Sequence, residues 1–338
     1  MRALTLTAKR KFDLIEKPIP QAGENTAVIK ISHAGICGSD IHMIWDAGHR
    51  AGTNFVIGHE FCGTISDPGN SDFRVGERVV AMEITPCGQC EFCKSGRPQL
   101  CGKVMGGPGL AFDGGYAEYT AVRSDMILRL PDTVSDLEGA LVEPTAISMH
   151  AVRLAGVGPG SKVLVVGGGA IGLFAAACAK ALGAAYVGLT EVNASRIRLA
   201  EESTFVTRVF HGGAEDLAQQ LAAASEGGFD VVVECSGNAA AADIGLHSLK
   251  RGGKMMAVAY GKNPTLDLFN LVNNEWSIGG SLFFTVEDFQ LVIDLMAEKK
   301  LDLAKYAEVI PMEKAQSAFE AVTGGGECAV KYVMDMCL

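Results

Sequence analysis

Four cysteines form the densest group of chemically reactive side chains in the sequence. They are Cys87, Cys90, Cys93 and Cys101, with the spacing C-x2-C-x2-C-x7-C. Four closely spaced thiolates can enclose Zn²⁺ in a tetrahedral shell that leaves no position open for a substrate. We therefore predict a closed, structural zinc site that stabilises the lobe at residues 84–108.

A second set of potential metal ligands precedes this cluster. Cys37 supplies a soft anionic ligand, His59 an imidazole nitrogen and Glu60 an adjacent carboxylate. A catalytic zinc site needs fewer protein ligands than a structural one, because one position stays open for the reacting molecule. Each of the three residues is unremarkable alone, so the prediction of an open zinc site depends on a cofactor motif in the same chain.

Ten cysteines could also form disulfide bonds in a secreted protein. The sequence shows no signal-peptide pattern, and basic residues follow its short polar start at once. The four clustered cysteines are also too close together for a disulfide framework that spans 338 residues. Metal binding is therefore the favoured interpretation, and we expect a cytoplasmic protein.

The composition argues against two classes of function. The net charge of −10 disfavours binding of nucleic acid, which requires a basic surface. The sequence has no uninterrupted apolar run of about 18 residues, so we expect no association with a membrane through a spanning helix. With 48% hydrophobic and 20% charged residues, the chain is typical of a globular protein long enough for two domains.

The two halves of the chain predict different kinds of structure. In the first half, alternating or β-branched segments predict strands at 27–31, 78–82 and 117–122. A segment rich in glycine and proline follows at 156–160. Beyond it we expect strands at 162–166, 186–190, 229–234, 254–258 and 329–334. We also expect a helix that the segment 167–172 opens and that runs through residue 181, and another at about 289–299. Alternation of strands and helices predicts a doubly wound parallel sheet.

The strand at 162–166 leads into a glycine-rich turn. Gly167, Gly169 and Gly172 form a G-x-G-x-x-G motif that also contains Ile171. Glycine is common in this chain, with 41 residues, but this motif follows a buried strand and opens a helix, which is the context a dinucleotide-binding turn requires. The glycines permit a tight turn and close approach of the backbone to a pyrophosphate, which the free N–H groups of the helix would bind.

Glu191 lies at the end of the next strand, where a carboxylate can accept hydrogen bonds from the adenosine ribose. A carboxylate there repels the 2′-phosphate of NADP, so we predict NAD as the cofactor. Arg196 follows closely and could favour a phosphate, which leaves NADP as the second possibility.

Together these motifs resemble those of the zinc-dependent medium-chain dehydrogenases, in the branch with sorbitol, threonine and butanediol dehydrogenases. Residues 35–42 (GICGSDIH) are similar to the family's first zinc-ligand segment, with Cys37 as the ligand, and residues 58–60 (GHE) to its second, with His59. The cysteine lobe and the glycine motif follow in the family's order, and the resemblance covers the whole chain. It implies an NAD-dependent enzyme that oxidises the CH–OH group of a small alcohol, with one catalytic and one structural Zn²⁺ per subunit.

The resemblance also assigns roles to further residues. Glu143 matches the position at which this branch carries a glutamate that ligates the zinc or holds its water, in alternation with Glu60. Ser39 and His42 match the family's proton relay, in which the serine hydroxyl takes the alcohol proton and passes it through the nicotinamide ribose to the histidine, which releases it to solvent. We expect Asp40 to orient the loop that carries the cysteine ligand.

The predicted substrate depends on weaker signals. The polyol branch usually has an arginine in the segment that corresponds to 281–284, where this chain has Phe283. We also expect Phe112 and Ser39 to contact the substrate. Fewer hydrogen-bonding groups disfavour a long polyol, because its hydroxyls would be buried without partners. A short secondary alcohol or vicinal diol such as 2,3-butanediol is therefore the first prediction, a sorbitol-like polyol the second and L-threonine the third.

A non-catalytic NAD-binding sensor is the alternative from another class. A sensor has no need of the zinc-ligand and relay residues together, which favours the enzyme. Formation of NADH from a short diol, and its loss when the labile zinc is chelated, would distinguish the two.

We therefore predict an α/β fold in two domains. A Rossmann domain at 146–284 would bind NAD, and a GroES-like, β-rich catalytic domain made of residues 1–145 and 285–338 would carry both zinc sites. The substrate is expected in the cleft between the domains. The resemblance also implies a homodimer or homotetramer, and residues 277–282 could form an edge strand that pairs across a two-fold axis.

Overall fold

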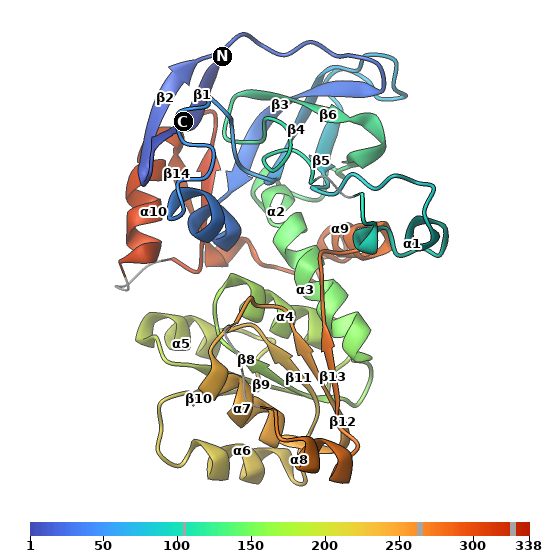
Figure 1. The fold of residues 1–338 in the computed structure, drawn as a ribbon, viewed down its shortest axis with the longest axis vertical. Helices are drawn as coiled ribbons and strands as arrows, with labels where there is room; N and C mark the ends of the chain where they lie inside the picture. The colour runs from blue at the N-terminus through green and yellow to red at the C-terminus, as the bar shows by residue number, and fades with distance from the viewer. Residues whose placement is uncertain (104–105, 262–265, 325–328) are drawn as a thin grey trace. The chain divides into compact units, whose positions relative to one another are not determined.

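The computed structural model describes residues 1–103, 106–261, 266–324 and 329–338. These residues form two compact units (Figure 1). Unit 1 contains Met1–Glu143 and Thr285–Leu338, and unit 2 contains Pro144–Phe284. From the sequence we placed the boundaries after residues 145 and 284. Residues 104–105 of the expected zinc lobe, 262–265 of the expected Rossmann domain and 325–328 of the expected catalytic domain lie outside the described residues.

Unit 1 is built on a mixed sheet of seven strands. Their order is β14 (Ala307–Pro311), β15 (Lys331–Asp335), β3 (Thr26–Gly35), β4 (Glu60–Asp67), β5 (Arg78–Ala81) and β7 (Ile127–Arg129), with β6 (Tyr119–Arg123) paired to β3. β14 and β15 are parallel, and the other pairs are antiparallel. β1 (Arg2–Ala8) and β2 (Lys11–Glu16) form a separate hairpin.

The register of β3 and β4 explains how distant ligand segments come together. Gly35, the last residue of β3, pairs with Glu60, the first residue of β4. After β3 the chain turns into a short π-helix at Asp40–Trp45. Because the pairing joins the end of one strand to the start of the next, the segments that carry Cys37 and His59 are neighbours in space.

Among the described residues, five α-helices lie wholly or partly in unit 1. They are α1 (Glu91–Lys94), α2 (Asp136–Ala140), α3 (Val142–Ala155), which continues into unit 2, α9 (Val286–Ala297) and α10 (Ala315–Thr323). A capping box of Thr285 and Asp288 starts α9 three residues before the expected start at 289. A second capping box, of Ser135 and Glu138, starts α2.

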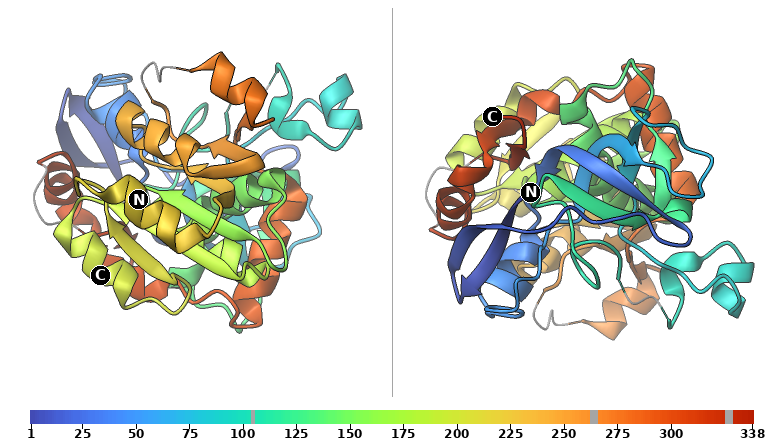
Figure 2. Two further views of the ribbon diagram at one scale, coloured as in Figure 1. Left: turned by 90° about the horizontal axis from the view of Figure 1, so that it is seen from below. Right: turned by 90° about the horizontal axis from the view of Figure 1, so that it is seen from above.

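The cysteine lobe is a small part of unit 1 with little regular structure. It contains α1 and one 3-10 turn at Pro98–Leu100. Figure 2 shows the segment with α1 extending away from the strands of the unit. Four residues of helix and one such turn bury little apolar surface, so this lobe needs another source of stability.

Unit 2 is a parallel sheet of six strands with helices packed against it (Figure 1). The strands are β8 (Lys162–Val166), β9 (Tyr186–Glu191), β10 (Arg208–His211), β11 (Phe229–Glu234), β12 (Leu249–Ala257) and β13 (Ser277–Gly280), in the order β10-β9-β8-β11-β12-β13. All pairs are parallel. This is the Rossmann strand order, so the predicted doubly wound parallel sheet is confirmed.

The helices of unit 2 alternate with these strands. They are α4 (Ala170–Ala181), α5 (Ala194–Glu201), α6 (Leu217–Ser225), α7 (Ala239–His247) and α8 (Leu268–Asn273). Helix α4 starts within the glycine-rich segment and ends at Ala181, as predicted. Its third residue, Gly172, must lack a side chain, since a Cβ atom would lie 1.8 Å from the carbonyl oxygen of Gly167.

Some strand bounds differ from those predicted. The strand expected at 117–122 starts at Tyr119, because Ala117 instead bridges to Ala3 and the N–H of Glu118 donates to the carbonyl of Arg2. β12 starts at Leu249, five residues before the expected strand, and β15 starts at Lys331. Among the described residues, no helix has the length and apolar character needed to span a membrane.

Candidate metal and cofactor sites

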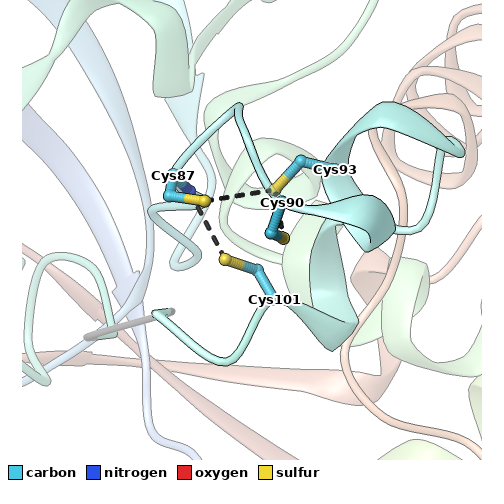
Figure 3. Close-up of side chains that lie close together, drawn as sticks. All are labelled: Cys87, Cys90, Cys93 and Cys101. Atoms are coloured by element: carbon cyan, nitrogen blue, oxygen red, sulfur yellow. Dashed lines mark hydrogen bonds between the residues drawn. The ribbon is translucent and has the colours of Figure 1, made fainter.

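The sulfur atoms of Cys87, Cys90, Cys93 and Cys101 lie within 4.8 Å of one another and point toward a common centre (Figure 3). The Cys93 sulfur is 3.5 Å from that of Cys90 and 3.9 Å from that of Cys87. Zn–S bonds of about 2.3 Å in a tetrahedron place neighbouring sulfurs about 3.8 Å apart. The group therefore fits one Zn²⁺ with four thiolate ligands.

Backbone donors around the lobe favour thiolates. The N–H groups of Gln89 and Cys90 lower the pKa of Cys87 to about 6, and the N–H of Cys87 lowers the pKa of Cys101. Cys93 behaves in the opposite way, because desolvation and the hydrogen bond with Cys90 raise its pKa to about 11. A divalent cation would favour the ionised form of all four thiols.

Cys37, His59 and Glu60 form a second group, and their ligand atoms also lie within 4.8 Å of one another. Cys37 is half-buried, whereas His59 and Glu60 are buried. The residue before His59 must be glycine. Gly58 has φ +94°, and a Cβ atom there would lie 2.2 Å from the ring of Tyr116.

The imidazole of His59 lies between two buried carboxylates. Its Nδ1 is 3.5 Å from Oδ1 of Asp40, and its Nε2 is 3.4 Å from Oε2 of Glu83. Burial lowers the pKa of His59, but the charges of Glu83 and Asp40 outweigh this effect and raise it well above its ordinary value. The negative charge that favours a proton on this ring would equally favour a divalent cation beside it.

Glu83 and Glu143 form a third group with His59, again with ligand atoms within 4.8 Å of one another. Glu143 lies in the first turn of α3, and Glu83 follows β5 by two residues. Both side chains are buried. Burial raises the pKa of Glu143 well above its ordinary value, and the charge of Glu83 raises it further. The sequence indicated Glu143 through the resemblance, whereas Glu83 was missed.

Lys331 was also missed. Its Nζ donates to Oε1 of Glu60 at 2.6 Å, and the two side chains are only 4% and 1% exposed. Burial lowers the pKa of Lys331, but the charge of Glu60 more than offsets this and raises it. A lysine between the apolar residues Val330 and Tyr332 was the signal that could have identified it.

Asp40 holds the loop that carries Cys37. One of its oxygens, Oδ2, accepts a hydrogen bond from the Cys37 N–H at 3.2 Å and another from the Tyr116 hydroxyl at 2.7 Å. Tyr116 also donates to the carbonyl of Gly35 at 3.1 Å. The buried tyrosine thus ties the end of β3 to the loop that follows it.

The remaining residues predicted to act on the substrate are divided between the units. Ser39 is half-buried at the start of the π-helix in unit 1, and His42 is exposed within that helix. Phe112 is a 45% exposed residue of unit 1. Phe283 belongs to unit 2, where its φ of +50° is an unfavourable conformation for a bulky side chain.

A cavity of about 480 Å³ lies at the carboxyl end of the parallel sheet in unit 2. Gly167, Gly169, Glu191 and Arg196 line it, together with residues of β8, β9, α6 and α7. Ile171 and Gly172, in the first turn of α4, are not part of this lining. The cavity has the position and the glycine-rich wall that a dinucleotide requires.

The Glu191 side chain is fixed by the backbone around it. Its carboxylate accepts hydrogen bonds from the N–H groups of Gly168 at 2.9 Å, Val192 at 2.6 Å and Asn193 at 2.9 Å. The guanidinium of Arg196 lies 3.9 Å from the same carboxylate. The acidic and basic groups predicted to select between NAD and NADP thus stand side by side at one cavity.

Two side-chain clusters suited to zinc and a Rossmann sheet with a dinucleotide cavity define a zinc-dependent oxidoreductase. Comparisons with known proteins agree. Residues 23–132 match the model of the alcohol dehydrogenase GroES-like domain, and residues 170–298 match that of the zinc-binding dehydrogenases.

Individual relatives span nearly the whole chain. D-xylulose reductase A of Aspergillus niger is 30% identical over 328 residues, which cover 93% of this chain and 91% of that protein. Sorbitol dehydrogenase of Bacillus subtilis is 30% identical over 338 residues, which cover 97% of this chain and 95% of that protein. The crystal structure of 2R,3R-butanediol dehydrogenase from Bacillus subtilis matches with a TM-score of 0.87, at 26% identity and 99% coverage of both chains.

The chain therefore belongs to the zinc-dependent medium-chain dehydrogenase family, with a GroES-like domain and a Rossmann-type domain. The predicted family and fold are confirmed, and the protein is an enzyme of the alcohol and polyol dehydrogenase class.

Proposed function

We propose that this enzyme oxidises a secondary hydroxyl of a vicinal diol to a ketone, with NAD⁺ as the hydride acceptor. The observation that carries the proposal is the pair of ligand groups in unit 1 that share His59: Cys37 and Glu60 lie on one side of the pair, and Glu83 and Glu143 on the other. A thiolate, an imidazole and a carboxylate are the ligand types of an open catalytic zinc site.

The ion pair between Lys331 and Glu60 supports Glu143 as the resting zinc ligand. Glu60 already has a cationic partner in Lys331. The charged groups that act on Glu143 include Glu83 and His59, which belong to the same metal cluster. In this proposal Cys37, His59 and Glu143 hold the catalytic zinc. Glu60 stays with Lys331 unless that ion pair opens.

Bound zinc makes the substrate hydroxyl more acidic, which prepares the carbon atom beside it to lose a hydride to NAD⁺. The chain's own residues move the proton. Ser39 accepts it at its hydroxyl, and His42, exposed in the π-helix, releases it to water. Asp40 holds the imidazole and the cysteine loop in place, because it lies against both.

We further propose that NAD is preferred over NADP. Three backbone N–H groups hold the Glu191 carboxylate at the wall of the cavity, and the ribose hydroxyls of NAD would bind to it there. The 2′-phosphate of NADP would meet a fixed negative charge at the same place.

Short diols are the first candidate substrates, because Phe283 stands where polyol enzymes of this branch usually carry an arginine. The crystal structure of a butanediol dehydrogenase among the neighbours is in line with this choice. Polyols of five or six carbons are the second candidate. They are favoured by the two relatives that are 30% identical, a D-xylulose reductase and a sorbitol dehydrogenase.

The test is NADH formation across 2,3-butanediol stereoisomers, 1,2-propanediol, xylitol, sorbitol, galactitol and L-threonine, compared by kcat/KM. Highest values for short diols would support the first candidate. Highest values for xylitol or sorbitol would establish the second and show that other polar groups replace the missing arginine. No turnover of any diol by the zinc-loaded enzyme would contradict the proposed reaction.

We also propose a homo-oligomer formed through β13. This strand is the last in its sheet, so one edge of it has no partner strand among the residues that the structure describes. Exposed apolar side chains lie on and near it, at Ile278, Leu282, Phe269 and Val272. Gly279→Pro should weaken pairing of the edge and lower the mass in sedimentation, and a monomeric wild-type enzyme at micromolar concentration would refute the proposal.

A further inference from the structure

Two buried carboxylates end the strands on either side of β8. In the sheet β8 lies between β9, whose last residue is Glu191, and β11, whose last residue is Glu234. Their exposed fractions are 7% and 4%. Glu191 is the proposed partner of the cofactor ribose, whereas Glu234 has no part in the proposed reaction. A buried carboxylate needs partners that compensate its desolvation, so the partners of Glu234 indicate what it does.

The Glu234 side chain binds the loop that follows it. Its Oε1 accepts hydrogen bonds from the N–H of Ser236 at 2.8 Å, from the N–H of Gly237 at 2.9 Å, and from the Ser236 hydroxyl. Its backbone carbonyl accepts from the N–H of Val258 at 2.9 Å, which ties the residue to the segment after β12. Charge-assisted hydrogen bonds from three donors thus restrain the loop at 235–238.

This loop forms part of the wall of the unit 2 cavity and packs against the glycine-rich turn. Its residues in the wall are Cys235, Ser236 and Asn238. The N–H of Cys235 donates to the carbonyl of Val166, directly before the turn, at 2.8 Å. A Cβ atom on Gly167 would lie 3.0 Å from the backbone nitrogen and Cα of Ser236. The turn is therefore in direct contact with the loop that the buried carboxylate holds.

We propose that Glu234 is a positioning residue for the dinucleotide, which holds the loop at 235–238 against the glycine-rich turn and so keeps the cavity in its binding shape. The inference rests on the proposed function, in which a nicotinamide dinucleotide occupies this cavity. On the other side of β8, Glu191 accepts a hydrogen bond from the N–H of Gly168, in the same turn. The two carboxylates thus restrain the turn from both neighbouring strands.

The physical reason is preorganisation. A ligand that has to order its own site loses affinity, because the ordering opposes binding. Without the Glu234 carboxylate, the donors of the loop would turn to water, and the cofactor would have to order the loop again. The helix that follows does not depend on Glu234, since the side chain of Asn238 caps α7 by accepting from the N–H groups of Ala240 and Ala241.

Two variants of similar size separate hydrogen bonding from packing. Glu234→Leu removes the acceptor, whereas Glu234→Gln keeps an oxygen that can accept from the same donors. The first readout is the dissociation constant of NADH for the zinc-loaded enzyme, from the change in NADH fluorescence. We expect Glu234→Leu to weaken NADH binding at least about tenfold, with Glu234→Gln close to wild type. The second readout is hydrogen exchange at residues 235–238, which should become faster in Glu234→Leu and stay slow in Glu234→Gln.

Asp230→Asn is the matched control. Asp230 is a carboxylate of the same strand that pairs with Lys250, and it is not among the described residues that line the cavity. This variant should lower the stability of unit 2 without changing the affinity for NADH.

Wild-type affinity in Glu234→Leu would overturn the inference, and so would equal losses in Glu234→Leu and Glu234→Gln. If the leucine variant is insoluble, Glu234→Asp takes its place, because its carboxylate is one methylene too short to reach the loop donors in their present positions. A wild-type enzyme that binds neither NADH nor NADPH would contradict the proposed function, and the inference with it.

Discussion

Lys331 and Glu60 form a buried ion pair although 271 positions separate them in the chain. The pair joins β15, at the carboxyl end of the sequence, to the first residue of β4 beside His59. Each side chain is almost fully buried, so each depends on the other for compensation of its charge. The strand β15, near the carboxyl end of the chain, thus holds a residue of the metal site that is formed by segments near the amino end.

Replacement of Lys331 by methionine should therefore destabilise unit 1. It leaves the buried Glu60 carboxylate without its cation, a change that typically costs about 3–5 kcal/mol. Trp45 is buried in unit 1 and Trp276 lies in unit 2. Urea unfolding followed by Trp45 fluorescence, in a Trp276→Phe background, measures the effect.

Lys300→Met is the control. Lys300 pairs with Glu298 at the surface, where both side chains are more than half exposed, so the change should stay below about 0.5 kcal/mol. A double variant, Lys331→Met with Glu60→Gln, should recover part of the lost stability. Equal stability of Lys331→Met and wild type would show that the ion pair is absent in solution.

Cys93→Ser should unfold the cysteine lobe. A structural zinc contributes on the order of 10 kcal/mol in small zinc domains, and this lobe has only α1 and one 3-10 turn to replace it. We expect the loss of one zinc per subunit in elemental analysis. Trypsin should then cleave rapidly after Lys94 and Lys103, which are exposed in the lobe. Cys337→Ser, at an exposed terminal cysteine, should change neither result.

The sequence was informative wherever local spacing determines the structure. The Cys87–Cys101 cluster and the turn from β8 to α4 are both encoded within about twenty residues, so their ligand types and glycines could be recognised directly. Contacts between segments that are distant in the sequence could not be recognised in this way. The approach of Lys331 to Glu60 depends on the sheet order β15-β3-β4, and no local pattern specifies that order.

Glu83 illustrates the same limit at shorter range. It follows an apolar strand, where an acidic residue is most simply explained as the polar end of that strand. Its functional interest appears only when α3 brings Glu143 against it. Two acidic residues that are brought together by packing leave no fixed spacing in the sequence, so their proximity could not be recognised from it.

Glu191→Ala should shift cofactor preference toward NADP. The substitution removes the negative charge at the cavity and leaves Arg196 to bind the 2′-phosphate. We expect the ratio of kcat/KM for NADP to that for NAD to rise at least about tenfold, which corresponds to about 1.4 kcal/mol. In the double variant Glu191→Ala with Arg196→Ala, the affinity for NADP should be lower than in Glu191→Ala alone. An unchanged ratio in the single variant would exclude Glu191 as the selecting residue.

Asp230 should make the stability of unit 2 depend on pH in the acid range. It accepts a hydrogen bond from the Lys162 N–H at 2.6 Å and pairs with Lys250, so it links β8, β11 and β12. Partial burial raises the pKa of Asp230, but the interactions with Lys250 and Lys162 outweigh it and lower the pKa below its ordinary value of 3.8.

A carboxylate with a lowered pKa stabilises the fold while it is ionised. Its contribution is complete above the unfolded-state pKa and disappears as the pH falls through the folded-state value. Asp230→Asn should therefore cost about 1 kcal/mol near neutral pH, and the difference from wild type should shrink only below about pH 4. Trp276 fluorescence in a Trp45→Phe background reports on unit 2. None of the proposed zinc ligands belongs to this unit, since Glu143 at the start of α3 is part of unit 1. A difference that persisted unchanged to about pH 2 would mean that packing at this position, rather than the charge of Asp230, is what stabilises the three strands.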